Sequence, residues 1–353
     1  MKAQDFSEQL QQQVQQAIAG KQPVRITGSG SKAFYGRETE GDVLDISAHQ
    51  GIINYEPKEL VVTVRSGTRL ADLNAVLAEQ GQMLAFEPPA FGEDATIGGT
   101  IACGFSGPRR AAAGSARDFV LGASIINGRA ELLHFGGEVM KNVAGYDVSR
   151  LMVSAMGTLG VLIDISMKTI PRPFEEITLQ RECTYQQAIE RMNELAGIDL
   201  PVSATFFDGL NLYIRLSGAA PAIKAGEKRI GGERADNNAI WQNIREHSHA
   251  FFRQDKALWR LSLPSDAACF ELPGKQCIEW GGALRWLVSD ADPSQVRSAA
   301  ERAGGSAILF RGGDRQGEVF HPLTDGMKTI HQNLKRSFDP DGIFNPGRMY
   351  REF

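Results

Sequence analysis

Residues 92–122 read GEDATIGGTIACGFSGPRRAAAGSARDFVLG. The block is dense in glycine, and Arg109, Arg110 and Arg117 are set among the glycines. Glycine lets backbone amides come close to a bulky anion, and a run of such amides forms a concavity that binds phosphate. Core packing explains one or two glycines in a strand, but not a block of this density. We therefore expect an anion-binding loop region here, because loops with many special backbone positions usually carry function.

A second glycine-rich loop comes earlier in the chain. A short β-branched strand over 24–27 is followed by GSGSK over 28–32. With Ala33, these residues formally match the G-x-G-x-x-A fingerprint of NAD-binding folds, and Asp45 follows at a plausible distance. That fold needs a helix that opens on the glycines. Residues 34–42 (FYGRETEGD) show no apolar periodicity and predict a loop, which argues against an NAD site.

Four stretches, in this order, resemble the FAD-binding domain of the vanillyl-alcohol oxidase (PCMH-type) flavoproteins. They are residues 23–36, the block 92–122, residues 136–152 (GGEVMKNVAGYDVSRLM) and residues 154–173 (SAMGTLGVLIDISMKTIPRP). In the second half, LWRLSLPSD (258–266), WGGALRW (280–286) and DPDGIFNPGRMY (339–350) are similar to one branch of that family, the FAD-binding E subunits of bacterial glycolate oxidase. The resemblance therefore covers essentially the whole chain.

The resemblance implies an α+β fold in three parts. A PCMH-type FAD-binding domain of two α/β subdomains would span 1–173, and a shortened α+β cap domain with an antiparallel sheet would span 174–335. Residues 336–353 would return to the FAD domain. Apolar periodicity predicts helices over 7–19, 69–80, 185–196, 220–230, 293–303 and 324–337. It predicts strands over 24–27, 43–46, 60–65, 120–126, 160–168, 202–207, 211–216, 258–263, 283–288 and 306–310.

The resemblance also implies which residues hold FAD. The loop after residue 27 would bind the pyrophosphate, the 92–122 block the ribityl chain and isoalloxazine, and the segment after Met156 the adenosine end. The residues expected to bind are Gly28, Ser29, Gly30, Ser31, Lys32, Pro88, Thr96, Gly98, Gly99, Ser106, Gly107, Gly114, Arg117, Gly157, Gly160, Val161 and Asn345. Serines stand where some family members carry a histidine linked to FAD, so we expect non-covalent FAD. For residues 141–147, a structural turn and a catalytic role both stay open.

Two arginines of the second half are candidate ligands for the carboxylate of a small substrate. In LWRLSLP, strand alternation puts Arg260 on the face opposite Trp259 and Leu261. Arg285 shares its face with apolar residues, and a cation in such a setting needs an anionic partner. For either arginine, an internal ion pair is the alternative.

Composition excludes several classes of function. The chain has 353 residues and a formal net charge of −4, with both signs mixed, so no nucleic-acid surface is expected. The polar N-terminus and the lack of long apolar runs predict a cytoplasmic protein, with peripheral membrane association only through partners. The four cysteines form no C-x-x-C pair, which argues against an iron–sulfur cluster. His247 and His249 are expected on a solvated surface, and no metal site is expected.

The resemblance implies an FAD-binding subunit of a multi-subunit glycolate (D-2-hydroxy-acid) dehydrogenase or oxidase. A catalytic FAD subunit and an iron–sulfur subunit would be its partners, because electrons must leave this chain. Related D-2-hydroxy-acid dehydrogenases carry a metal-binding H-G-D-G-N segment, whereas residues 310–314 here contain no histidine. No general base is recognisable. A non-catalytic assembly subunit with structural FAD therefore stays open, as does a free-standing alditol or sugar-lactone oxidase.

Overall fold

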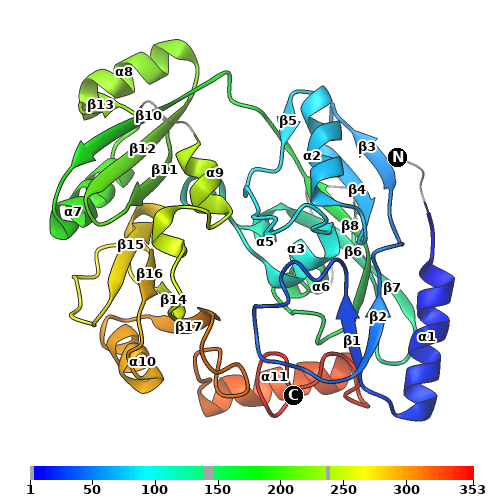
Figure 1. Ribbon diagram of the computed structural model, residues 1–353. Coiled ribbons are helices and arrows are strands. Elements are labelled where there is room, and N and C mark those ends of the chain that lie inside the picture. Colours follow the sequence, from blue (N-terminus) through cyan, green and yellow to red (C-terminus); the bar gives the residue numbers. More distant parts are fainter. Residues whose placement is uncertain (1–3, 138–146, 236–238) are drawn as a thin grey trace.

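Two large sheets organise the protein, one in each half of the chain (Figure 1). The computed structural model describes residues 4–137, 147–235 and 239–353, so most of the predicted 141–147 turn lies outside the described residues. The predicted boundary at residue 173 falls between the last strand of the first half and the first strand of the second sheet. We call the part before this boundary the N-terminal region and the part over 174–335 the cap region.

The N-terminal region contains two α/β layers. Its elements are α1 (Ser7–Gly20), β1 (Val24–Thr27), β2 (Asp42–Asp45), β3 (Ile52–Glu56), β4 (Val61–Arg65), α2 (Leu70–Glu79), β5 (Gln82–Met83), α3 (Ile97–Cys103), α4 (Arg110–Ala113), α5 (Ala116–Phe119), β6 (Val120–Ile126), β7 (Leu132–Gly136), α6 (Val148–Leu151), β8 (Val161–Lys168) and β9 (Ile170–Pro171). Strands β1 and β2 form a parallel pair covered by the apolar face of α1. The antiparallel sheet β3-β4-β8-β6-β7 is covered by α2 and α3, whose buried leucines and isoleucines share one core with β4, β6 and β8.

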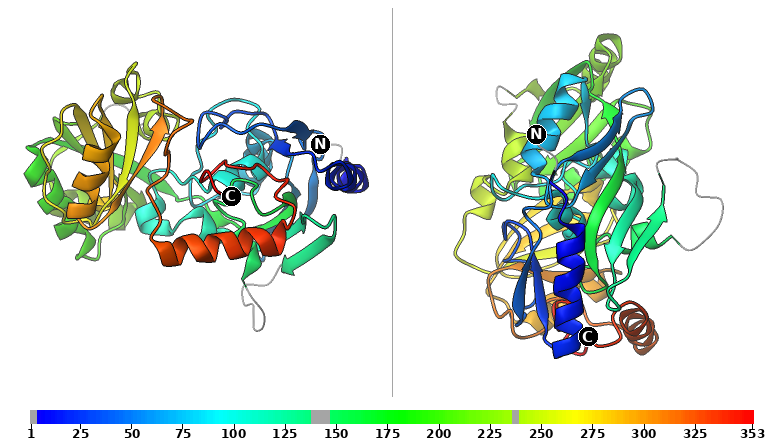
Figure 2. Two further views of the ribbon diagram at one scale, coloured as in Figure 1. Left: turned by 90° about the horizontal axis from the view of Figure 1, so that it is seen from below. Right: turned by 90° about the vertical axis from the view of Figure 1, so that its right-hand side faces the viewer.

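The cap region is built on one antiparallel sheet of order β13-β10-β12-β11-β15-β16-β14-β17. Its elements are β10 (Glu175–Glu182), α7 (Tyr185–Ala196), β11 (Val202–Phe207), β12 (Asn211–Gly218), α8 (Ala220–Ile230), β13 (Glu233–Arg234), α9 (Ile240–Arg245), the 3-10 turn η1 (Ala250–Phe252), β14 (Leu258–Ser262), β15 (Lys275–Glu279), the 3-10 turn η2 (Trp280–Gly282), β16 (Leu284–Val288), α10 (Pro293–Arg302) and β17 (Ser306–Arg311). Helices α7, α8 and α10 cover the outer face of the sheet, and the inner face is turned toward the N-terminal region (Figures 1 and 2).

The C-terminal segment returns to the N-terminal region after α11 (Asp325–Phe338), which runs along the base of the molecule (Figure 1). The Val24 amide of β1 donates to Ile343 O at 2.8 Å, and the Asn345 amide donates to Val24 O at 2.9 Å. The segment after α11 therefore forms part of the wall beside β1. Across the described ranges, no helix combines the length and apolar character that crossing a bilayer requires.

Most predicted elements are present, with ends that differ by one or two residues. The block 92–122 departs from expectation, because α3, α4 and α5 interrupt what the glycines predicted to be loop. Local caps explain the difference: Thr96 Oγ1 accepts a hydrogen bond from the Gly99 amide at 3.2 Å, and Ser115 forms a capping box with Asp118. Such caps stabilise short helices against the poor helix propensity of glycine.

Candidate functional site

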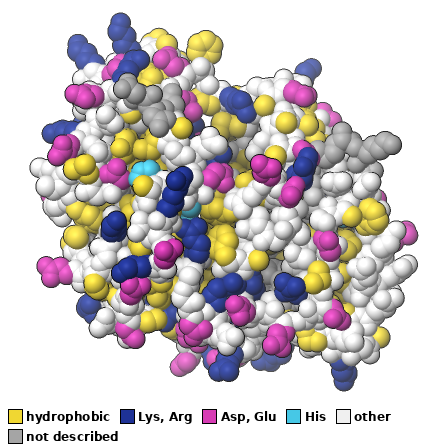
Figure 3. Space-filling view, viewed as in Figure 1, with side chains coloured by type: hydrophobic (Ala, Val, Ile, Leu, Met, Phe, Trp, Pro, Cys, Tyr) yellow, Lys and Arg dark blue, Asp and Glu magenta, His cyan; other side chains and the backbone are white. Residues whose placement is uncertain are grey.

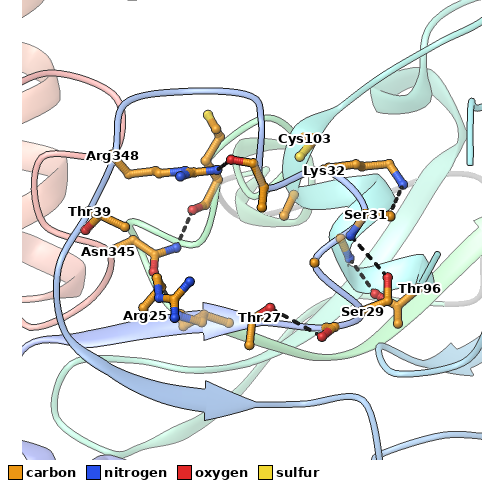
Figure 4. A pocket seen from close by; sticks show the side chains of 17 residues that line it. Arg25, Thr27, Ser29, Ser31, Lys32, Thr39, Thr96, Cys103, Asn345 and Arg348 are labelled. Carbon is orange, nitrogen blue, oxygen red and sulfur yellow. Dashed lines mark hydrogen bonds between the residues drawn. The ribbon is translucent and has the colours of Figure 1, made fainter. Parts of the chain in front are cut away.

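A groove lies between the loop that follows β1, the start of α3 and the C-terminal segment (Figure 4). We call it the β1 groove. The loop 28–32 lines it with Thr96, Gly99, Met156 and Asn345. A second hollow shares Gly28, Gly99 and Asn345 with it and continues along Gly98, Gly157 and Gly160. The two hollows therefore adjoin each other along these shared walls.

The β1 groove is cationic. Arg25, Lys32 and Arg348 approach it from three segments (Figure 4), and none of the described residues that line it is acidic. Lys32 is 6% exposed, and its ammonium donates only to neutral oxygens, Ala90 O at 3.0 Å and Ser31 Oγ at 3.4 Å. Burial is the main cause that lowers the pKa of Lys32. A buried cation without a contacting carboxylate is stabilised by an anionic ligand.

Three glycines shape the groove in two ways. A Cβ atom on Gly28 would lie 2.4 Å from Thr96 Oγ1, and one on Gly157 would lie 2.6 Å from Asn345 Nδ2. These two glycines therefore allow the walls to pack closely. A Cβ on Gly99 would meet only Thr96 Oγ1, at 3.2 Å, although Gly99 lines both hollows. The absence of a side chain at Gly99 therefore keeps space free in the groove, and the packing of the fold does not require it.

Asn345 supports the wall of the groove. It is 5% exposed, its Oδ1 accepts from the Ile26 amide at 2.8 Å, and its Nδ2 donates to Met156 O at 2.6 Å. Both ends of the amide are therefore used to join β1 to the turn at Met156. Met156 itself has a left-handed φ of +53°, which this bond helps to hold.

The structure brings eleven of the seventeen residues predicted to bind FAD into these two hollows and places six outside them. Ser106 and Gly107 line a neighbouring pocket, and Pro88 lines a surface hollow together with Ser31. Gly114, Arg117 and Val161 line none of these hollows, and FAD binding by them stays a prediction. Gly114 ends α4 with φ +107°, the Arg117 side chain is exposed on α5, and Val161 is buried within β8.

The neighbouring pocket lies between the N-terminal region and the inner face of the cap sheet. We call it the interdomain pocket. Its walls include Ser106 and Gly107 on one side and Arg260, Glu279 and Trp286 on the other. The Trp280 indole donates to Gly107 O at 3.0 Å, so the two regions touch at its edge. Basic side chains also gather near the middle of the face in Figure 3, where the two regions meet.

Glu279 is a candidate acid–base group that sequence reasoning missed. It ends β15 with 4% exposure, and the Trp286 indole donates to its Oε1 at 2.7 Å. Burial raises the pKa of Glu279 to about 7, against the opposing effects of the Trp286 hydrogen bond and the Arg260 charge. A carboxyl with this pKa can accept or release a proton near neutral pH. Nothing in the sequence indicated this role for Glu279, because the strand over 275–279 was not predicted.

The two candidate arginines lie on opposite faces of the cap sheet. In the β14–β16 register Arg260 pairs with Trp286, whereas Arg285 pairs with Leu261. Arg260 therefore faces the interdomain pocket, where its guanidinium lies 5.1 Å from the centre of the Trp280 ring. Among the residues that the structure describes, Arg260 has no ion-pair partner.

Arg285 has a structural role instead. It is fully buried on the outer face, and its guanidinium donates to Gly282 O at 2.7 Å, to the Tyr185 hydroxyl at 2.9 Å and to Ala267 O at 3.1 Å. These neutral acceptors satisfy its donors without an internal acid or a substrate carboxylate. Arg260 alone remains a candidate ligand for a carboxylate.

The expectation for His247 was wrong. Its ring stacks on Phe252 with centroids 4.0 Å apart and lines the interdomain pocket. Burial, followed by the charges of Arg311 and Arg260, places the pKa of His247 well below its usual value, so the ring is neutral. His249 is also half-buried, and its Nδ1 accepts from the Phe251 amide at 3.3 Å. Within the described ranges, no group of three or more His, Cys, Asp or Glu side chains could hold a metal ion.

A buried ion cluster joins the two regions beside these sites. Glu87 of the N-terminal region accepts from Arg109 at 3.0 Å and from Arg215 of the cap region at 2.9 Å. Glu176 of the cap region also pairs with Arg109. The exposed fractions of Glu87, Arg109 and Arg215 are 9%, 7% and 4%. The cluster therefore fixes how the inner face of the cap sheet meets the N-terminal region.

Comparisons with known proteins agree with this architecture. A family model described as an FAD binding domain matches residues 6–136. The substrate-bound crystal structure of p-cresol methylhydroxylase has a TM-score of 0.75 at 14% identity, over 98% of this chain and 87% of that one. A structure of alkyldihydroxyacetonephosphate synthase has a TM-score of 0.69 at 14% identity, over 96% of this chain and 75% of that one. The expected PCMH-type fold is confirmed.

Sequence relatives are more specific. The chain is 31% identical over 159 residues to glycolate oxidase subunit GlcD of Bacillus subtilis, and this alignment covers 44% of this chain and 34% of that protein. It is 51% identical over 348 residues to glycolate oxidase subunit GlcE of Escherichia coli K12, and this alignment covers 99% of this chain and 98% of that protein. The chain therefore belongs to the GlcE family of glycolate oxidase subunits and carries their FAD-binding domain.

Proposed function

We propose that this chain is an FAD-binding subunit that oxidises glycolate, or a related small 2-hydroxy acid, as part of a multi-subunit complex. The observation that carries the proposal is the pairing of a cationic groove with an adjoining pocket that holds an unpaired arginine. The first suits the pyrophosphate of FAD, and the second suits a substrate carboxylate. The names of the GlcE and GlcD relatives support both the substrate class and the complex.

The residues of the β1 groove fit FAD. The loop 28–32 would supply backbone amides and serine hydroxyls to the pyrophosphate, and Lys32 would supply charge. The hollow along Gly98, Gly157 and Gly160 would hold the adenosine end. The histidine nearest the loop in sequence, His49, is not among the residues that line the groove, which supports non-covalent binding. When bound, FAD supplies the two-electron acceptor that oxidation of an alcohol needs.

Arg260 would orient the substrate. Its planar guanidinium can bind a carboxylate through two hydrogen bonds, and the Trp280 ring beside it limits its movement. The buried side chains around the pocket, among them Trp286 and Glu279, would exclude water. We infer that an iron–sulfur subunit and a further FAD subunit complete the complex, and that any association with the membrane is through these partners.

Lys32→Met is expected to change stability and FAD affinity in opposite directions. Loss of a charge-assisted contact should weaken FAD binding by about 10-fold to 100-fold. Without FAD, the same substitution should raise the thermal midpoint, because the folded state no longer buries a cation whose pKa it lowers. FAD titration of the apoprotein and thermal unfolding measure the two effects. Equal FAD affinity in Lys32→Met and wild type would contradict the role of Lys32.

Arg260→Met is expected to weaken glycolate binding by about 10-fold to 100-fold while the flavin content stays the same. The loss follows because a substrate carboxylate would enter the pocket without its cation. Arg297→Met is a matched control, since Arg297 lies 5.5 Å from the Trp259 ring on the outer face of the same sheet. Titration of each FAD-loaded variant with glycolate makes the comparison. Similar losses of glycolate affinity in both variants would show that Arg260 stabilises the cap sheet and does not bind the substrate.

The missing H-G-D-G-N segment favours a second candidate function, an assembly subunit whose FAD is structural. The two functions differ in an anaerobic experiment on the FAD-loaded chain. Loss of the flavin absorbance band on addition of glycolate to the isolated chain indicates a competent substrate site. Loss of the band only with partner subunits present indicates a relay, and a band that never changes indicates structural FAD.

A further inference from the structure

The proposed function leaves one buried ionisable group without a role. Glu279 lies at the end of β15, on the inner face of the cap sheet, and lines the interdomain pocket. Its register partners, Phe206 on β11 and Leu284 on β16, are apolar. The Trp286 indole is the single hydrogen-bond donor to Glu279 among the described residues. A buried carboxyl with one partner has lone pairs left for a ligand in the pocket.

The charged and titratable groups around Glu279 are mostly basic. They are Arg260 from β14, Arg245 and His247 from α9 and the loop after it, Arg110 from α4, and Cys277 from β15 itself. The Tyr35 hydroxyl, from the loop after β1, forms a side-chain hydrogen bond with Arg260 and is neutral, because burial raises the pKa of Tyr35 to about 12. None of them forms an ion pair with Glu279. His247 is neutral, and Arg245 already pairs with Glu246 at 2.8 Å. Arg260 and Glu279 are therefore left as one unpaired cation and one carboxyl in the same pocket.

This combination matches a small carboxylate with a neighbouring hydroxyl. Arg260 would take the carboxylate, and the hydroxyl would donate a hydrogen bond to Glu279 when Glu279 is ionised. A 2-oxo acid has only an acceptor at that position, so it would receive a hydrogen bond from the neutral form of Glu279. The pocket can therefore hold both members of the pair, provided that the protonation state of Glu279 changes between them.

We propose that Glu279 is the residue that accepts the hydroxyl proton of the 2-hydroxy acid bound at Arg260. This inference rests on the proposed function and adds to it the missing base. Oxidation of a 2-hydroxy acid to a 2-oxo acid breaks the C2–H and O–H bonds and forms the second C–O bond of the carbonyl. FAD is the acceptor, by class, for the hydride from C2. The hydroxyl proton goes to a Glu279 oxygen, and the resulting acid then donates to the new carbonyl oxygen.

The electrostatics of the site support this assignment. Burial raises the pKa of Glu279 to about 7, so both protonation states are populated near neutral pH. The Trp286 hydrogen bond and the Arg260 charge oppose this rise and keep the ionised form accessible. A base with its pKa near the working pH combines the right protonation state with a useful driving force for proton transfer.

The pH dependence of ligand affinity tests the proposal without turnover. Glycolate is titrated into the FAD-loaded protein after its flavin has been reduced with dithionite, and pyruvate is titrated into the oxidised protein. Because the glycolate hydroxyl forms its stronger, charge-assisted hydrogen bond with ionised Glu279, glycolate affinity should rise by up to about 10-fold between pH 6 and pH 8 for a pKa of about 7. Pyruvate needs neutral Glu279, so its affinity should fall about 10-fold over the same range.

Three variants identify the titrating group. In Glu279→Gln, both affinities should become independent of pH. In Glu271→Gln, which removes an exposed carboxylate from the loop before β15, both profiles should be as in wild type. In Trp286→Phe, the midpoint should move to higher pH, since a hydrogen bond that lowers the pKa of Glu279 is lost.

The outcomes separate this inference from the proposed function. Wild-type profiles that are flat, or that persist in Glu279→Gln, would overturn the assignment of Glu279 while leaving the substrate site in place. Failure of wild type to bind glycolate at any pH would instead contradict the proposed substrate. Opposite slopes for glycolate and pyruvate, both lost in Glu279→Gln, are the result we expect.

Discussion

Gly99→Val is expected to remove bound FAD from a protein that still folds. Gly99 lines both parts of the groove, so a branched side chain there would occupy space that the cofactor needs. The fold should accept the change, because the added Cβ would meet only the Thr96 hydroxyl, at 3.2 Å, and Gly99 lies in the first turn of α3. We expect flavin content to fall from about one per chain to less than about a tenth, which requires an affinity loss well above 10-fold.

Gly326→Val provides the matched control for this prediction. Gly326 also lies in the first turn of a helix, α11, and a Cβ there would meet no atom within 4 Å. Absorbance of each purified variant gives its flavin content, and circular dichroism shows whether it is folded. A folded Gly99→Val protein that keeps its flavin would show that FAD does not pass along α3.

Glu87→Gln is expected to cause the largest loss of stability among the substitutions considered. The change removes the negative charge that Arg109 and Arg215 share and leaves two buried guanidinium groups with Glu176. Breaking a buried ion pair from one side typically costs about 3–5 kcal/mol, because the remaining charge stays desolvated. Since the cluster joins the two regions, unfolding of the cap region from the N-terminal region should become easier.

Chemical denaturation of wild type and Glu87→Gln measures this loss. The control is Glu194→Gln, which removes one partner of an exposed pair on α7, where Glu194 is 60% exposed. Surface pairs of this kind contribute little, so the control should unfold with wild type. A Glu87→Gln protein as stable as the control would mean that the cluster does not hold the two regions together.

The effect of Glu87 also depends on pH. Burial raises the pKa of Glu87, but Arg215 and Arg109 together outweigh burial and leave the pKa below its ordinary value of 4.5. A lowered pKa means that the stabilisation is fully present above about pH 4.5 and is lost as pH falls through the folded-state value. The difference in stability between wild type and Glu87→Gln should therefore shrink in acid.

The sequence predicted the FAD side of the molecule well because local signals specify it. The β-branched strand β1 and the loop 28–32 lie where their composition placed them, and the glycines at 28, 98 and 99 come together in one groove. In the 92–122 block, Gly114 ends α4 and Arg117 lies on α5, both outside the two hollows, and FAD binding by them stays a prediction. A high density of glycines indicates that another group comes close to the backbone, but it does not distinguish a ligand from a neighbouring segment of the protein.

The substrate side could not be predicted in the same way, because it depends on strand register and on contacts between distant segments. Strand alternation placed Arg260 and Arg285 each on a face, but only the pairing of β14 with β16 shows that the two faces are opposite. Glu279 meets Trp286 and Arg260 only after β15 and β14 have paired with β16. His247 looked solvated because Trp286 and Phe310, which pack on its ring together with Phe252, are far away in sequence.

FAD binding in the β1 groove is tested most directly by the absorbance spectrum of the purified chain, recorded before and after acid precipitation. We expect a flavin band at about one flavin per chain, and acid should release the flavin into the supernatant because the cofactor is not covalently bound. The band should be absent from Gly99→Val and present in Gly326→Val. A colourless wild-type chain that also fails to bind added FAD would contradict the assignment of the β1 groove.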